Sequence, residues 1–123
     1  MKILIKVTRD VLERSKMCGF TTGLITENCM LALAFRDLFS DACVYIDEVY
    51  LLGGIGWSAK DRIILPQIAV KNRDQFDSIQ PHQRVLMSPF SFEIEVPEYV
   101  ISKIGIGEIY RVLSESKTLE LVM

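Results

Sequence analysis

Residues 28–39 form the longest apolar run of the chain and contain neither proline nor glycine. On a helix, one stripe is formed by side chains at the spacing i, i+3, i+4, i+7 and i+8. The residues at that spacing are Leu31, Ala34, Phe35, Leu38 and Phe39. Met30 and Leu33 widen the stripe, and a helix so apolar must be covered on more than one side. We therefore predict that residues 28 to about 40 form the central helix of the core.

Two segments at opposite ends of the chain alternate between apolar and polar residues, which is typical of strands with one buried face. Residues 2–8 place lysines between Ile3, Ile5 and Val7. Residues 90–96 alternate more strictly, and we predict a strand whose glutamates, Glu93 and Glu95, face water. Its core-facing residues would be Phe90, Phe92, Ile94 and Val96.

The rest of the chain predicts short helices and a hairpin or meander. β-Branched and aromatic residues predict strands at about residues 43–46, 48–52 and 62–65. Helices are expected at residues 9–16 after a Thr8 cap, at 66–78 beginning with Pro66, at 98–103 and at about 108–114. Residues 79–89 hold two prolines and predict an ordered loop. Together these elements predict one α+β domain, residues 1–123, with a mostly antiparallel sheet packed on the central helix.

Charge and hydropathy argue against several kinds of partner. The formal net charge is −2, whereas nucleic acids and anionic membranes favour strongly basic surfaces. No apolar run reaches the roughly 18 residues that a membrane-spanning helix needs, and the lysines near the start do not fit a signal peptide. We therefore expect a cytoplasmic protein. Three cysteines (Cys18, Cys29 and Cys43) and one histidine lack the spacing of a disulfide framework or a zinc site, so no metal or cofactor is expected.

Cys29 lies at the start of the predicted central helix, where the helix dipole lowers the pKa of a thiol. Thiol hydrolases of the papain type place their nucleophile at such a position and recruit a histidine from a later segment. The histidine available here is His82, which lies in the proline-flanked segment without a surrounding motif. Because cysteine also packs well as a small apolar residue, we interpret Cys29 as core packing. A small cysteine-dependent hydrolase that uses Cys29 and His82 is the alternative.

A glycine-rich segment, Gly53-Gly54-Ile55-Gly56, precedes the single tryptophan of the chain. It lacks the lysine and hydroxyl residue that end a P-loop, so we expect a hairpin tip instead. A tryptophan beside cations is typical of binding surfaces. We therefore predict Trp57, Lys60 and Arg62 as ligand- or partner-binding residues, with a tryptophan folded onto the core as the other possibility.

Three pieces of sequence occur in a distinctive order. The segment Ile5-Lys6-Val7-Thr8 comes first, Asn28-Cys29-Met30-Leu31-Ala32-Leu33-Ala34 follows, and Phe76-Asp77 precedes Ser-Pro-Phe-Ser-Phe-Glu-Ile-Glu-Val-Pro at 88–97. This order resembles small uncharacterised proteins of bacteriophages, prophages and bacterial mobile elements, many of which have a proline at the position of Met30. The resemblance spans most of residues 3–97 and supplies no catalytic residues.

That resemblance implies a non-enzymatic accessory protein in the cytoplasm of a bacterial host. Such a protein would act by binding, and it would block or sequester a host defence protein or a small signalling nucleotide. We also expect a homo-oligomer. The stretches of opposite net charge that alternate along the chain would suit self-association or a protein partner, and a solvated surface explains them as well. A purely structural protein that oligomerises through its last residues, Leu119–Met123, is a third possibility.

Overall fold

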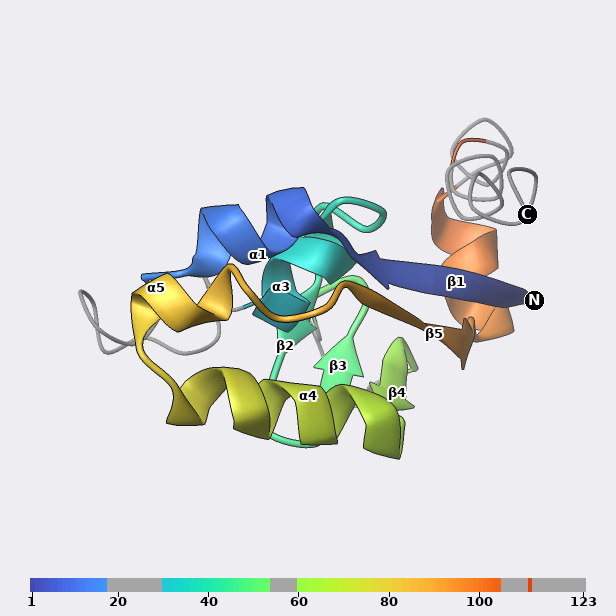
Figure 1. Cartoon of the computed structure of the whole chain (residues 1–123). Coiled ribbons are helices and arrows are strands. Elements are labelled where there is room, and N and C mark those ends of the chain that lie inside the picture. The colour runs from blue at the N-terminus through green and yellow to red at the C-terminus, as the bar shows by residue number, and fades with distance from the viewer. Residues whose placement is uncertain (18–29, 54–59, 105–110, 112–123) are drawn as a thin grey trace.

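The structure, a computed structural model, describes residues 1–17, 30–53, 60–104 and 111 of the chain. It contains both helices and antiparallel strands, which confirms the predicted α+β class (Figure 1). Residues 98–104 are also helical, in agreement with the helix predicted there. In chain order the other elements are β1 (Lys2–Val7), α1 (Arg9–Ser15), α3 (Met30–Arg36), β2 (Cys43–Val44), β3 (Glu48–Tyr50), β4 (Arg62–Ile64), α4 (Gln67–Ser78), α5 (Pro81–Arg84) and β5 (Phe90–Glu95).

The described strands form two separate antiparallel sheets, whereas one sheet was predicted. β1 pairs with β5, and β2, β3 and β4 form a meander in that order. Helix α3 contacts α1, β1, β2 and α4, so it touches both sheets (Figure 1). The central position predicted for this helix is therefore confirmed.

The two alternating segments pair with each other across almost the whole chain. Ile3 lies opposite Ile94, Ile5 opposite Phe92 and Val7 opposite Phe90. These side chains are buried, except that Phe90 is partly buried, while both glutamates of β5 are exposed. The predicted strands and their faces are therefore confirmed. The observed register places the apolar residues of both strands on the same side of the sheet, facing the core.

Helix α3 ends earlier than predicted, although its apolar stripe is buried as expected. The helix ends at Arg36, and the chain then turns, with Arg36 Nε donating to the carbonyl oxygen of Ala42 at 3.0 Å. Leu38 and Phe39 lie beyond the helix and are still buried. Residues 28 and 29 lie outside the described part, so the predicted start of the helix is not observed.

The neighbouring helices follow their local sequence signals. Thr8 caps α1, as predicted, because its hydroxyl accepts a hydrogen bond from the Val11 amide at 3.2 Å. Pro66 precedes α4 as its N-cap, so the helix begins one residue later than predicted. The buried line of α4 runs through Ala69 and Phe76, whereas Ile68 is 46% exposed.

The segment predicted as a loop at residues 79–89 contains the short helix α5. Pro81 occupies the first turn, where its missing N–H costs no hydrogen bond. The side chains of Gln80 and Gln83 each accept a hydrogen bond from the backbone of the other residue, which forms a capping box. The predicted helix at 108–114 is described only at Arg111, which is helical, and residues 119–123 lie outside the described part.

Candidate functional site

The register of the meander gathers chemically active side chains on one face. Glu48 lies opposite Ile64, and Tyr50 lies opposite both Cys43 and Arg62. The Tyr45 amide donates to the Glu48 carbonyl oxygen at 2.8 Å, which continues the pairing. Because side chains alternate between the faces of a sheet, all of these project from the same side. We call this the outer face, and it consists of Cys43, Tyr45, Glu48, Tyr50, Arg62 and Ile64.

The opposite face of the meander belongs to the core. Val44 and Val49 are 2% and 0% exposed, and Ile63 packs against the buried cluster. On the outer face, in contrast, Tyr45 is 48% exposed and Ile64 is 62% exposed. The apolar inner face therefore positions the outer face rigidly while leaving it accessible.

Glu48 organises the outer face. Its Oε1 accepts a hydrogen bond from the Tyr50 hydroxyl at 3.0 Å, and its Oε2 lies 3.3 Å from Arg62 Nε. The rings of Tyr45 and Tyr50 pack edge to face with centroids 5.5 Å apart. The Glu48 carboxylate thus binds both the Tyr50 hydroxyl and the Arg62 guanidinium, and the Tyr50 ring in turn packs against the ring of Tyr45.

The hydrogen bond to the Glu48 carboxylate raises the pKa of the Tyr50 hydroxyl above its usual value, and desolvation and the glutamate charge act in the same direction. A carboxylate that accepts from a neutral phenol stabilises the protonated form. We therefore expect Glu48→Gln to lower the pKa of Tyr50 towards the value of a free tyrosine. The measurement is a pH titration of the tyrosine ring signals by NMR.

Glu93→Gln is the matched control for this titration, since Glu93 is an exposed carboxylate on β5. It should leave the pKa of Tyr50 unchanged. An unchanged Tyr50 pKa in Glu48→Gln would show that the hydrogen bond does not persist in solution.

The predicted binding residues are distributed over two neighbouring places. Arg62 belongs to the outer face. Lys60 is exposed, and its Nζ lies 5.6 Å from the centroid of the Tyr99 ring, on the helix at residues 98–104. Lys103 Nζ lies 5.4 Å from the same centroid. Trp57 lies outside the described residues, so its predicted role stays a prediction.

The alternative catalytic pair is described only in part. His82 is exposed on α5, whose first residue is Pro81. Cys29 lies outside the described residues, so the distance between the two side chains is not observed. A hydrolase built on these residues therefore stays a prediction.

Sequence reasoning missed five members of the outer face, namely Cys43, Tyr45, Glu48, Tyr50 and Ile64. Their strands are two or three residues long, so alternation within each strand is too short to show which side chains share a face. The available signal was the pair Tyr45 and Tyr50, which flank a hairpin turn and thereby reach the same side of two adjacent strands.

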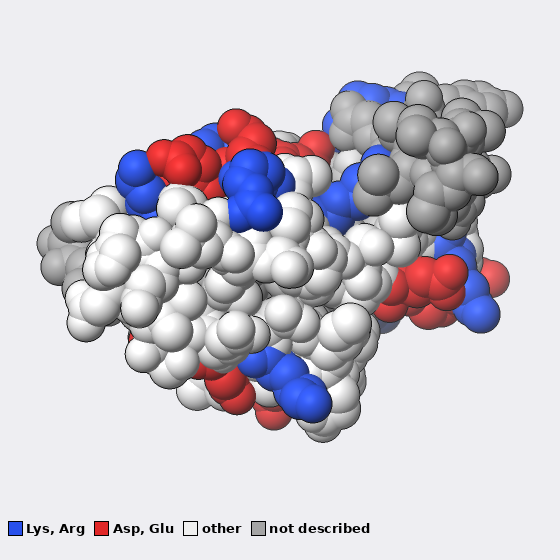
Figure 2. Space-filling model, in the orientation of Figure 1, with Lys and Arg blue, Asp and Glu red and all other residues white. Residues whose placement is uncertain are grey.

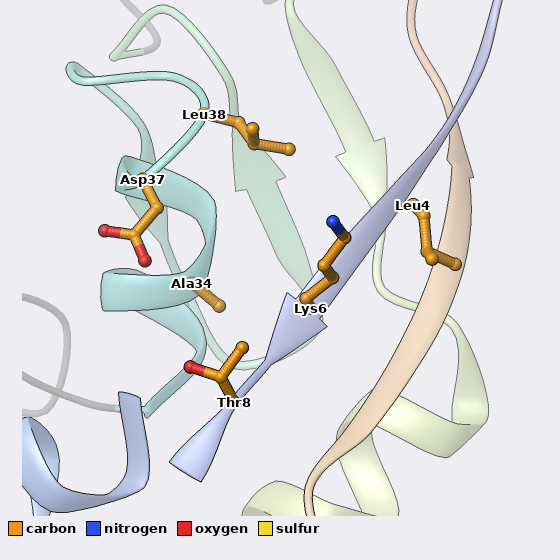
Figure 3. A pocket seen from close by; sticks show the side chains of 6 residues that line it. All are labelled: Leu4, Lys6, Thr8, Ala34, Asp37 and Leu38. Carbon is orange, nitrogen blue, oxygen red and sulfur yellow. The ribbon is translucent and has the colours of Figure 1, made fainter. Parts of the chain in front are cut away.

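Two hollows in the described surface are small. One, between β1 and the end of α3, has a volume of about 130 Å³ and is shown in Figure 3. Lys6 and Asp37 lie on its two sides, and the Asp37 carboxylate already binds Arg14 at 2.9 Å. The other, near Leu52 and Ile104, has a volume of about 240 Å³. Both fall below the roughly 300–1,000 Å³ of typical small-molecule sites.

The charges visible on one face of the molecule are mixed in sign. Figure 2 shows acidic and basic side chains interspersed near α1, with a broad uncharged surface below them. Within the described ranges, no helix has the length and apolar character needed to cross a membrane. In that same part of the chain, His, Cys, Asp and Glu side chains form no group of three or more that could hold a metal ion.

Comparisons with protein-family models, with curated proteins and with solved structures found no significant match to this chain. The inference of function therefore depends on the residues themselves.

Proposed function

We propose that this chain is a non-enzymatic binding protein whose outer face recognises another protein. The observation that carries the proposal is the composition and order of that face. Tyrosine and arginine are enriched among the residues that dominate binding energy at protein interfaces. Here Tyr45, Tyr50 and Arg62 are placed together on a rigid sheet.

The contacts of Glu48 support this proposal further. Because Glu48 binds both Tyr50 and Arg62, these side chains lose less conformational entropy when a partner binds. An exposed Ile64 beside them supplies apolar area without a charge of its own. An exposed face with large tyrosine and arginine side chains suits a protein partner better than a small nucleotide, and the two small hollows argue in the same direction.

The proposed biological setting comes from the resemblance to phage and mobile-element proteins. In that setting the partner is a protein of the bacterial host, and binding blocks or sequesters it. The proposal includes the cytoplasm of the host as the place of action and requires no cofactor.

The test is capture of a partner from a lysate of the bacterial host, followed by affinity measurements with the purified partner. Arg62→Glu and Tyr45→Ala should each weaken binding at least about tenfold, as expected for residues at the centre of an interface. Lys71→Glu is the matched control, because it reverses one exposed cation on α4 that does not belong to the outer face. Equal affinities for Arg62→Glu and Lys71→Glu would contradict the proposal.

The hydrolase alternative is separated from binding by thiol chemistry. Alkylation of Cys29 is compared in the native chain and in His82→Ala. The binding proposal expects slow alkylation that does not depend on the histidine. Fast alkylation that slows in His82→Ala would indicate an activated thiolate and favour the enzyme.

A further inference from the structure

Strand β4 is an edge strand whose outward backbone groups lack partners among the described residues. Every second residue along β4 forms backbone hydrogen bonds with β3. The Leu51 amide donates to the carbonyl oxygen of Asp61 at 3.1 Å, and the Leu65 amide donates to that of Asp47 at 2.9 Å. In an antiparallel pair the intervening residues point their N–H and C=O groups away from the neighbour. Those residues are Arg62 and Ile64.

The two edges of the meander have different neighbours. The β2 edge strand contacts α3, the central helix of the core. At the β4 edge Ile64 is 62% exposed and the Arg62 side chain is 50% exposed. Figure 1 shows β4 at the end of the meander that lies away from α3. An accessible edge with unpaired backbone groups is a template for another strand.

We propose that β4 pairs in antiparallel orientation with β4 of a second copy of this chain. The two-fold axis would pass beside Ile63, so that Arg62 lies opposite Ile64 of the second copy and Ile64 lies opposite Arg62 of the second copy. The outward N–H and C=O groups of these residues would then form about four backbone hydrogen bonds. The two meanders would join into one continuous sheet.

Only this register is consistent with the chemistry of the strand. A shift of one pair towards the start would place Arg62 directly opposite Arg62 of the second copy, and like charges in that position are destabilising. A shift towards the end would place Arg62 opposite Pro66 of the second copy, which has no N–H to donate. The strand is therefore complementary to itself when centred on Ile63.

Charge complementarity favours a second copy as the occupant. Glu48 lies opposite Ile64 within one chain, so Arg62 of the second copy would lie two strands from Glu48. That separation is roughly 10 Å between backbones, which an arginine and a glutamate side chain can span together. Each glutamate would then face two arginines across the joined outer faces.

The dimer is expected to be reversible, because a three-residue strand contributes little area. Interfaces well below about 1,200 Å² are typical of weak association, so we expect a dissociation constant of roughly micromolar size.

Sedimentation velocity of the purified chain alone, over a wide concentration range, tests the pairing. The native chain should pass from monomer to dimer as its concentration rises. Ile64→Pro removes an outward N–H that the pairing of β4 with β3 does not use, while Ile64→Lys adds a charge to the edge. Each of these two substitutions should raise the dissociation constant of the dimer at least about tenfold. Leu86→Lys is the control and should leave the dissociation constant unchanged, because Leu86 is 76% exposed and follows α5, not β4.

A native chain that stays monomeric throughout would overturn the proposal, as would unchanged dimerisation in Ile64→Lys. Circular dichroism checks that each variant is folded, and Ile64→Lys keeps the test valid if Ile64→Pro unfolds.

Hydrogen exchange of the Arg62 and Ile64 amides gives a second measurement. Slowing with chain concentration supports self-pairing, whereas slowing only after addition of a host protein assigns the edge to that protein. Because no other protein is present in the first experiment, its outcome is independent of the proposed function.

Discussion

Replacing Phe35 with alanine should destabilise the fold by about 3–5 kcal/mol, the usual cost of deleting a fully buried aromatic ring. Phe35 is 0% exposed on α3, and its ring lies 5.9 Å from that of Phe92 on β5. The substitution therefore opens a cavity where the central helix meets the β1–β5 sheet. Chemical denaturation with urea gives the change in the free energy of unfolding.

Leu86→Ala is the control for this measurement, since Leu86 is highly exposed. Surface substitutions of this kind usually change stability by less than about 0.5 kcal/mol. If Phe35→Ala cost no more than Leu86→Ala, α3 could not be the centre of the core.

The second large effect is expected at Arg84, a charged residue that is only 2% exposed. Its Nε donates to the carbonyl oxygen of Phe76 at 2.8 Å, and its Nη1 donates to that of Lys16 at 2.9 Å. These carbonyls lie in the last turn of α4 and at the C-cap of α1. Helix ends carry unpaired carbonyls and partial negative charge, which suit a cation.

Arg84→Ala should therefore cost about 3 kcal/mol, because hydrogen bonds from a charged group contribute roughly 1.5 kcal/mol or more each. The guanidinium carbon also lies 4.1 Å from the centroid of the Phe76 ring, and that stacking would be lost as well. Thermal and urea denaturation of the variant measure the loss.

Arg84→Lys distinguishes geometry from charge. Lysine keeps the positive charge but lacks the planar fork that bonds two carbonyls while lying over a ring. We expect it to recover less than half of the loss. Full recovery in Arg84→Lys would mean that charge alone is required, and a native-like Arg84→Ala would remove the proposed link between the two helix ends.

The sequence predicted the parts of the fold that depend on local pattern. Alternation over six residues was enough for β1 and β5, since the apolar face of β1 is buried along its whole length and that of β5 is buried at Phe92 and Ile94. The apolar stripe identified α3 because its spacing repeats over two turns. The end of that helix was not predictable, because Leu38 and Phe39 continue the stripe while already lying in a turn.

The candidate site was harder to predict because it depends on pairing between strands. Arg62 could be chosen from its neighbours in the chain, but Glu48 joins it only through the register of β3 with β4. The burial of Arg84 has the same origin, since its partner carbonyls belong to two other helices and one of them lies 68 residues away. Single-sequence patterns carry no signal for such long-range contacts.

The pairing of β1 with β5 also determines when the fold can be completed during synthesis. Val7 pairs with Phe90, so the first strand emerges from the ribosome roughly 80 residues before the second. At about 5–20 residues per second, β1 waits on the order of 4–16 seconds for its partner. The meander closes over short distances and can form earlier. The apolar side chains of β1 are therefore the ones that a nascent chain must shield longest.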